Sequence, residues 1–230
     1  MEEKLLNYVL VFSGLLVMGI YHVWLLFTIL CNPRRTVIGF NAECRRAWVF
    51  SMMTDPMKNG VLAVQTIRNN IMASTVLATV ALTLCSLISV VVSTTLTSSS
   101  SETTFSSVKY FSILLCFLVA FLCNVQSIRY FAHISFMVTA PTLKDKKESI
   151  EYVARNLNRG SFFWSLGLRA YYLSFPLFLW IFGPIHMFVC CCIMSFILYF
   201  LDTTACFTQQ LQKFIEDMNA NDVESVHRSL

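Results

Sequence analysis

The chain contains 230 residues, of which 56% are hydrophobic and only 13% are charged, and its formal net charge is +4. Apolar segments of about 20 residues, the length needed to cross a bilayer, recur along it. This composition excludes a soluble globular domain. It predicts an all-α polytopic membrane protein with about four transmembrane helices in a single transmembrane domain over residues 1–205.

The first predicted span covers about 5–30. It opens with the acidic residues Glu2 and Glu3 and lacks a small-residue cleavage site, so we interpret it as a retained span and not as a signal peptide. Residues 34–60 then alternate basic pairs with aromatic and aliphatic side chains, which is typical of a segment on the membrane surface. We therefore expect an amphipathic interfacial helix over about 40–55.

The second predicted span, about 61–92, carries a hydroxyl-rich edge. On a helix with about 100° per residue, most of its polar side chains fall within an arc of roughly 80°. Hydroxyls in hydrocarbon need partners or water, so this edge either packs against other helices or lines an aqueous path. The candidate pore-lining residues are Gln65, Arg68, Asn69, Met72, Thr75, Thr79, Thr83 and Ser86.

The third predicted span covers about 108–138. Small side chains, including Cys116, Ala120 and Asn124, recur along one side of it. Small residues allow two helix backbones to approach closely in a membrane. This seam therefore predicts close packing against another helix.

The apolar run from 161 to 201 is too long for one span and follows a charged connection. We predict a second interfacial helix over about 150–173 and then one kinked span over about 175–201. Two short spans joined at Gly183-Pro184 are the alternative. A polar C-terminal tail is expected over 206–230.

Charge asymmetry predicts the topology. With four spans, the basic connections 31–60 and 139–160 fall on one side, which the positive-inside rule makes cytoplasmic. Both termini then lie on the opposite, more acidic side, an asymmetry that can also arise from membrane insertion alone. The candidate pore-mouth charges are Glu2, Glu3, Glu43, Asp55 and Asp202.

Several motifs carry a family resemblance, namely YHVWL at 21–25, GFNAECRRAWV at 39–49 and AVQTIRNNIMASTVLAT at 63–79. Together they resemble a plant integral membrane family formerly of unknown function, over about residues 10–205. Its functional precedent is the WeiTsing-type channel of the endoplasmic reticulum. The resemblance implies a ring-shaped homo-oligomer, expected as a homopentamer, that forms a calcium-permeable cation channel in plant defence signalling.

The leading hypothesis is therefore a cation channel in the endoplasmic reticulum, with the plasma membrane as the alternative location. Thr75, Thr79 and Thr83 would supply neutral oxygen ligands, and Met72 an apolar constriction. Arg68 would oppose cations unless it pairs with Glu43 or Asp55. The expected partners are further copies of the chain, membrane lipids and permeant ions, with no nucleic acid.

Two alternatives remain. Rings of Arg68 and Asn69 could favour an anion channel, and the basic connections could instead serve a non-conducting membrane scaffold that binds anionic lipid or a soluble partner. An enzyme is not expected, because no Ser/His/Asp or Cys/His arrangement, phosphate-binding glycine loop or HExxH motif occurs. We accordingly predict no catalytic residue, cofactor or bound metal, and we interpret the nine cysteines as packing residues.

Overall fold

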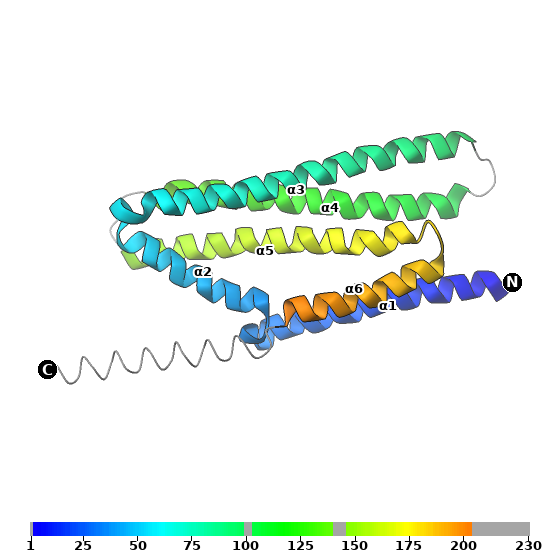
Figure 1. The fold of residues 1–230 in the computed structure, drawn as a ribbon, viewed down its shortest axis with the longest axis horizontal. Coiled ribbons are helices and arrows are strands. Elements are labelled where there is room, and N and C mark those ends of the chain that lie inside the picture. The colour runs from blue at the N-terminus through cyan, green and yellow to red at the C-terminus, as the bar shows by residue number, and fades with distance from the viewer. Residues whose placement is uncertain (1, 99–102, 140–145, 204–230) are drawn as a thin grey trace.

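Helices form nearly all of the part of the chain that the structure describes, which comprises residues 2–98, 103–139 and 146–203 (Figure 1). In this computed structural model the elements are α1 (Glu2–Cys31), the 3₁₀ turn η1 (Pro33–Arg35), α2 (Val37–Thr54), α3 (Pro56–Ser98), α4 (Thr103–Met137), α5 (Lys146–Leu179) and α6 (Pro184–Asp202). The prediction of an all-α protein is confirmed. The tail predicted over 206–230 lies outside the described residues.

Four of these helices are long and apolar enough to cross a membrane, which confirms the predicted number of apolar helices. The segments concerned are Leu6–Cys31, Pro56–Thr94, Ser107–Met137 and Pro184–Asp202. With 19 residues, α6 is about 28 Å long and matches the hydrocarbon core of a bilayer, about 30 Å thick. With 43 residues, α3 is about 64 Å long and extends well beyond that thickness.

Helices α1 and α6 lie side by side and run in the same direction (Figure 1). Thr36, which follows α1, accordingly forms an isolated antiparallel bridge with Thr203, which follows α6. The predicted topology, with both ends of the transmembrane domain on one side, is therefore wrong. The physical reason is that α5 runs back along α4 and adds a traverse of the bundle that the four apolar spans do not include.

The helix boundaries between 161 and 201 also differ from the prediction. Helix α5 continues unbroken to Leu179 with Pro176 inside it, and it lies lengthwise against α4 (Figure 1). The chain turns at Gly183, whose φ of 152° is accessible to glycine but strained for other residues. Pro184 then begins α6, where its missing N–H leaves no helical hydrogen bond unmade. The two helices are thus separated at the junction named in the alternative prediction.

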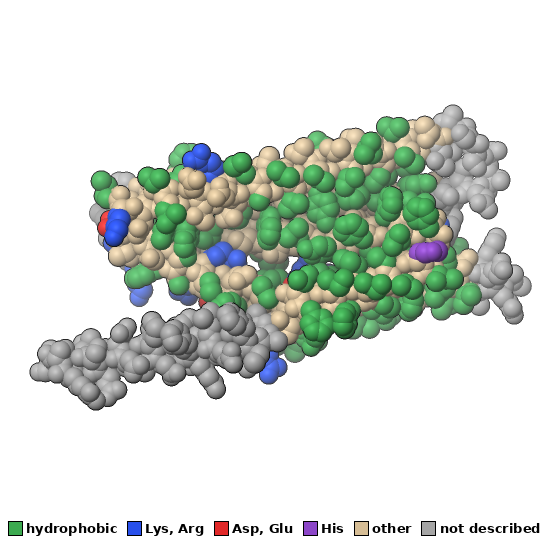
Figure 2. All heavy atoms as spheres, viewed as in Figure 1, with side chains coloured by type: hydrophobic (Ala, Val, Ile, Leu, Met, Phe, Trp, Pro, Cys, Tyr) green, Lys and Arg blue, Asp and Glu red, His purple; other side chains and the backbone are tan. Residues whose placement is uncertain are grey.

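Two large hydrophobic cores lie along the bundle, and a smaller cluster of Tyr21, Leu25 and Leu198 joins α1 to α6. The first joins α2, α3, α4 and α5 and includes Val49, Ile67, Ile134 and Val153 among its fully buried members. The second joins α1, α4, α5 and α6 and is formed by Met18, Ile113, Leu177, Met187, Cys191 and their neighbours. Lys and Arg side chains gather over the half that holds the first core (Figure 2). We refer to this half as the basic half and to the other as the apolar half.

Helices α4 and α5 pack closely along the predicted seam of small residues. An added Cβ at Gly167 would lie 2.8 Å from Asn124 Nδ2, and one at Gly160 would lie 2.9 Å from the ring of Phe131. Ser127 Oγ donates a 2.9 Å hydrogen bond to the carbonyl of Gly160. The prediction of close packing on this side of α4 is confirmed.

A tight turn joins α1 to α2. Thr36 Oγ1 caps α2 by accepting the backbone N–H of Gly39 at 3.2 Å, as Thr does at many helix N-termini. A Cβ at Gly39 would lie 2.0 Å from the carbonyl oxygen of Pro33, so no larger residue fits without rearrangement. This turn sets the angle at which α2 leaves α1 and reaches α5.

Candidate functional site

The polar edge of α3 is exposed along its whole predicted length. All eight candidate pore-lining residues are exposed in the single chain, namely Gln65, Arg68, Asn69, Met72, Thr75, Thr79, Thr83 and Ser86. Helix α3 is also the least buried of the four apolar helices. Only 11% of its most apolar 18-residue stretch is buried within the described chain, against 39% for that of α4. Within the described chain no other helix covers this edge, so it is available to lipid, water or another subunit.

The hydroxyls of this edge already have hydrogen-bond partners in their own helix. Thr75, Thr79 and Thr83 each donate to the carbonyl four residues earlier at 2.9 Å, and Ser86 does so at 3.0 Å. This local bond is an ordinary arrangement for Ser and Thr in membrane helices. The hydroxyl oxygens retain lone pairs that can accept a further contact.

Two predicted pore-mouth carboxylates, Glu43 and Asp55, are exposed in the basic half. Arg34 Nε donates to Glu43 Oε1 at 3.1 Å, and Asp55 Oδ1 accepts the backbone N–H of Lys58 at 3.3 Å. Arg68 pairs with neither of these carboxylates and has no ion pair among the described residues. The side chains of Glu2 and Glu3 lie outside the described part of the chain.

Asp202, the fifth predicted pore-mouth charge, is a largely buried ion-pair partner. Arg169 Nη2 donates to both carboxylate oxygens of Asp202 at 2.8 Å, and the hydroxyl of Tyr21 donates to Oδ2. The Arg169 and Asp202 side chains are only 14% and 13% exposed. The cluster therefore joins α1, α5 and α6 at the end of α6 that adjoins the basic half.

Sequence reasoning missed this cluster because an interfacial helix over 150–173, followed by a span over 175–201, puts Arg169 and Asp202 at opposite ends of that span. Each is an isolated charge in or beside an apolar run, and such charges in membrane proteins usually pair with one another. That rule was the available signal. A prediction that Arg169 pairs with Asp202 would also have required α5 to run the length of the bundle, so that α6 could return to Arg169.

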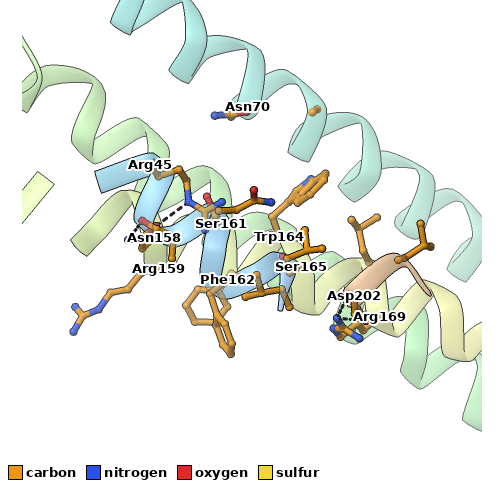
Figure 3. Close-up of a pocket in the computed structure, with 18 of the residues that line it drawn as sticks. Arg45, Asn70, Asn158, Arg159, Ser161, Phe162, Trp164, Ser165, Arg169 and Asp202 are labelled. Atoms are coloured by element: carbon orange, nitrogen blue, oxygen red, sulfur yellow. Dashed lines mark hydrogen bonds and ion pairs between the residues drawn. The ribbon is translucent and has the colours of Figure 1, made fainter. Parts of the chain in front are cut away.

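An arginine-lined cavity of about 830 Å³ adjoins the cluster. Residues of α2, α5 and α6 form most of its wall, with smaller contributions from α3 and α4. Its basic side chains are Arg45, Arg155, Arg159 and Arg169, and Asp202 is the only carboxylate among the described residues that line it. In Figure 3, Arg45 and Arg159 lie toward one end and the Arg169–Asp202 pair toward the other.

Polar and aromatic side chains complete the cavity wall. Arg45 Nε donates to Asn158 Oδ1 at 2.8 Å, and Asn158 Nδ2 donates to the carbonyl of Ala42 at 3.2 Å. Burial lowers the pKa of the Arg45 guanidinium from its ordinary value, but an arginine stays protonated at neutral pH. Phe162 and Trp164 lie between the two charged ends (Figure 3). The cavity thus combines fixed positive charge with an aromatic wall.

The chemistry available in the described chain is that of hydroxyls, arginines and aromatic rings. No group of three or more His, Cys, Asp or Glu side chains that could hold a metal ion occurs among the described residues. The eight cysteines in this part of the chain are all free thiols.

Comparison with known proteins gives a family but no characterised relative. No curated protein and no solved structure matches the chain. A family described as "Protein of unknown function, DUF599" matches residues 9–206, which is most of the chain and includes all four apolar helices except the first residues of α1. The protein therefore belongs to the DUF599 family of proteins.

Proposed function

We propose that this protein is a subunit of a homo-oligomeric, cation-selective ion channel whose pore is lined by α3. The observation that carries the proposal is the exposed polar edge of α3, which presents Thr75, Thr79 and Thr83 on the least buried apolar helix of the chain. Arg68 and Asn69 extend this edge at its basic end, and such side chains are poorly solvated by lipid tails. Contact with water or with further copies of the chain would solvate them.

A ring of identical subunits brings one α3 from each subunit to a common axis. The threonine side chains then form successive rings of neutral oxygen atoms, and Met72 forms an apolar constriction below them. A single chain with four apolar helices is too small to enclose an aqueous pore alone. Oligomerisation is therefore part of the proposal and not an addition to it.

The resemblance to the WeiTsing-type channel supplies the finer form of the proposal. On that basis the assembly is a homopentamer, permeable to calcium, in the endoplasmic reticulum membrane of a plant cell, and it acts in defence signalling. The plasma membrane is the alternative location. The partners are other copies of the chain, membrane lipids and permeant ions, and no cofactor is required.

Two observations favour competing functions. Arg68 is exposed with no ion pair among the described residues, which favours anion permeation if it faces the pore. The hydrogen bonds of the α3 hydroxyls within their own helix favour a non-conducting scaffold, because they let the edge pack without water.

Planar-bilayer recording of the purified, assembled protein tests the proposal. With unequal calcium and potassium salts on the two sides, we expect discrete openings that reverse near the cation equilibrium potentials. A reversal potential near the chloride equilibrium potential would refute cation selectivity and support an anion channel. Silence from protein shown by mass to be assembled would support the scaffold.

Paired substitutions locate the pore. Thr79→Phe places a bulky ring on the polar edge and is expected to reduce the single-channel current several-fold without abolishing assembly. Val80→Phe is the matched control, because Val80 is 43% exposed but lies about 100° around the helix. Equal single-channel currents from the two variants would show that the polar edge of α3 does not line the pore.

A further inference from the structure

Three arginines in the cavity have no acidic partner. Arg45, Arg155 and Arg159 form no ion pair with any described carboxylate, and Asp202 is already bound by Arg169. Neighbouring arginines differ in this respect, since Arg46 Nη2 lies 2.6 Å from Glu151 Oε2. Within the described part of the chain the cavity therefore carries a positive charge that no carboxylate compensates, and a bound anion would neutralise it.

With α6 taken as a membrane span, the cavity lies at the level where hydrocarbon gives way to lipid headgroups. Asp202 ends α6, whose length matches the hydrocarbon core, and Asp202 forms part of the cavity wall. From there the cavity continues toward α2 in the basic half. The positive-inside rule makes that half cytoplasmic, and the cytoplasmic leaflet carries the anionic phospholipids.

The cavity wall changes from aromatic to basic along the direction from α6 to α2. Arg45 and Arg159 lie toward the end remote from Asp202, whereas Phe162 and Trp164 lie between them and the Arg169–Asp202 pair (Figure 3). Leu201 of α6 adds a further apolar contact to the wall. The volume of about 830 Å³ lies within the usual range for sites that enclose small molecules.

One buried donor near the membrane end also lacks a partner. Arg169 Nη1 is buried and makes no hydrogen bond within the described structure, although Nη2 binds Asp202. Buried polar groups are nearly always satisfied by a protein atom, water or a ligand. A water molecule in the cavity would satisfy this nitrogen.

We propose that the arginine-lined cavity binds an anionic phospholipid of the cytoplasmic leaflet, with its phosphate on Arg45, Arg155 and Arg159 and an acyl chain along Phe162 and Trp164. The recognised chemistry is a phosphate ester, which a soluble metabolite could also offer. The place of the cavity favours the lipid, because Leu201 and Asp202 line it at the end of the apolar helix α6, where a lipid headgroup is at hand. The proposal does not depend on the pore proposed on α3, although Asn70 and Ala73 of α3 also line the cavity.

Native mass spectrometry of the full-length protein in neutral detergent tests the proposal. Dioleoyl phosphatidic acid, dioleoyl phosphatidylcholine and glycerol 3-phosphate serve as separate probes. We expect saturable binding of phosphatidic acid at least about tenfold tighter than that of the other two. Equal affinities for phosphatidylcholine and phosphatidic acid would show that the site does not select an anionic lipid and would overturn the proposal. Equal binding of glycerol 3-phosphate would show that the site takes a soluble phosphate ester and would overturn the lipid assignment.

The variant Arg155→Gln/Arg159→Gln removes two exposed charges that make no hydrogen bond in the described structure, so it should fold normally. We expect it to weaken phosphatidic acid binding about tenfold or more. The control Arg34→Gln/Arg46→Gln removes the same charge from exposed ion pairs outside the cavity and should bind like the parent. Equal weakening in both variants would reduce the effect to non-specific attraction by the basic half.

A second measurement places the acyl chain. Phosphatidic acid brominated on its acyl chains should quench the fluorescence of Trp164, and Trp164→Phe should abolish that component of the quenching. Quenching that persists unchanged in Trp164→Phe would place the lipid elsewhere and refute the proposal.

Discussion

Replacing Asp202 with alanine should destabilise the protein more than removing any exposed carboxylate. The substitution leaves the Arg169 side chain, which is only 14% exposed, without either of the oxygens that it now contacts at 2.8 Å. Removing one partner of a buried ion pair typically costs about 3–5 kcal/mol, because the remaining charge stays desolvated. The hydroxyl of Tyr21 also loses its acceptor, which adds about 1 kcal/mol.

The exposed pair of Arg34 and Glu43 is the matched control. Its side chains are 62% and 54% exposed, so water solvates the charge that remains after Glu43→Ala, and the expected loss is about 0–1 kcal/mol. The free energy of unfolding of each variant would be measured in mixed detergent micelles with increasing SDS. A loss for Asp202→Ala no larger than that for Glu43→Ala would refute the reasoning.

The double variant Arg169→Met/Asp202→Leu distinguishes two causes of the stability lost in Asp202→Ala, namely an unpaired buried charge and the loss of side-chain packing. Replacing both members of a buried pair with apolar residues of similar size is often neutral or stabilising. We therefore expect the double variant to recover most of the stability lost in Asp202→Ala. If the double variant is as unstable as the single one, the loss comes from packing around Asp202 and not from an unpaired guanidinium.

Three further predictions follow from backbone positions and topology. Gly39→Ala should lower the free energy of unfolding by about 1–3 kcal/mol through its clash with the Pro33 carbonyl, whereas Gly19→Ala, with no atom within 4 Å of the added carbon, should be neutral or slightly stabilising in the same assay. Gly167→Ala should cost a similar amount by pressing on Asn124, and a loss below about 0.5 kcal/mol would show that α4 and α5 move apart easily. Epitope tags at the two ends of the chain should be accessible from opposite sides of the membrane, and detection of both from one side would contradict the parallel arrangement of α1 and α6.

The apolar helices and the seam on α4 were predictable because each follows from a local rule. A run of apolar residues predicts a span, and small residues such as Ala120 and Asn124 predict a close helix contact. The traverse by α5 was not predictable in this way, because its charged first half and Pro176 resemble a surface helix followed by a break. Only its packing against α4 shows that one helix runs through both halves.

The polar edge of α3 could be predicted from local sequence, whereas the arginine-lined cavity could not. Helical periodicity placed the residues from Gln65 to Ser86 on one edge of α3, and the structure leaves all the named members exposed. The cavity depends on the contact of α2 with α5, and the residues that meet there are far apart in sequence, as with Arg45 and Asn158, which are 113 residues apart. They meet because α2 packs against α5, and no sequence period encodes that packing.

The continuous length of α3, α4 and α5 has a mechanical consequence for a protein with two cores. Each of these helices contributes side chains to the basic half and also reaches the apolar half, so neither half can shift without displacing the other. If α3 pivots as a rigid rod of about 64 Å around its midpoint, a tilt of about 10° moves each end by about 6 Å. A molecule that alters the spacing of α2, α5 and α6 at the cavity would thereby act on a lever whose far arm lies across the bilayer.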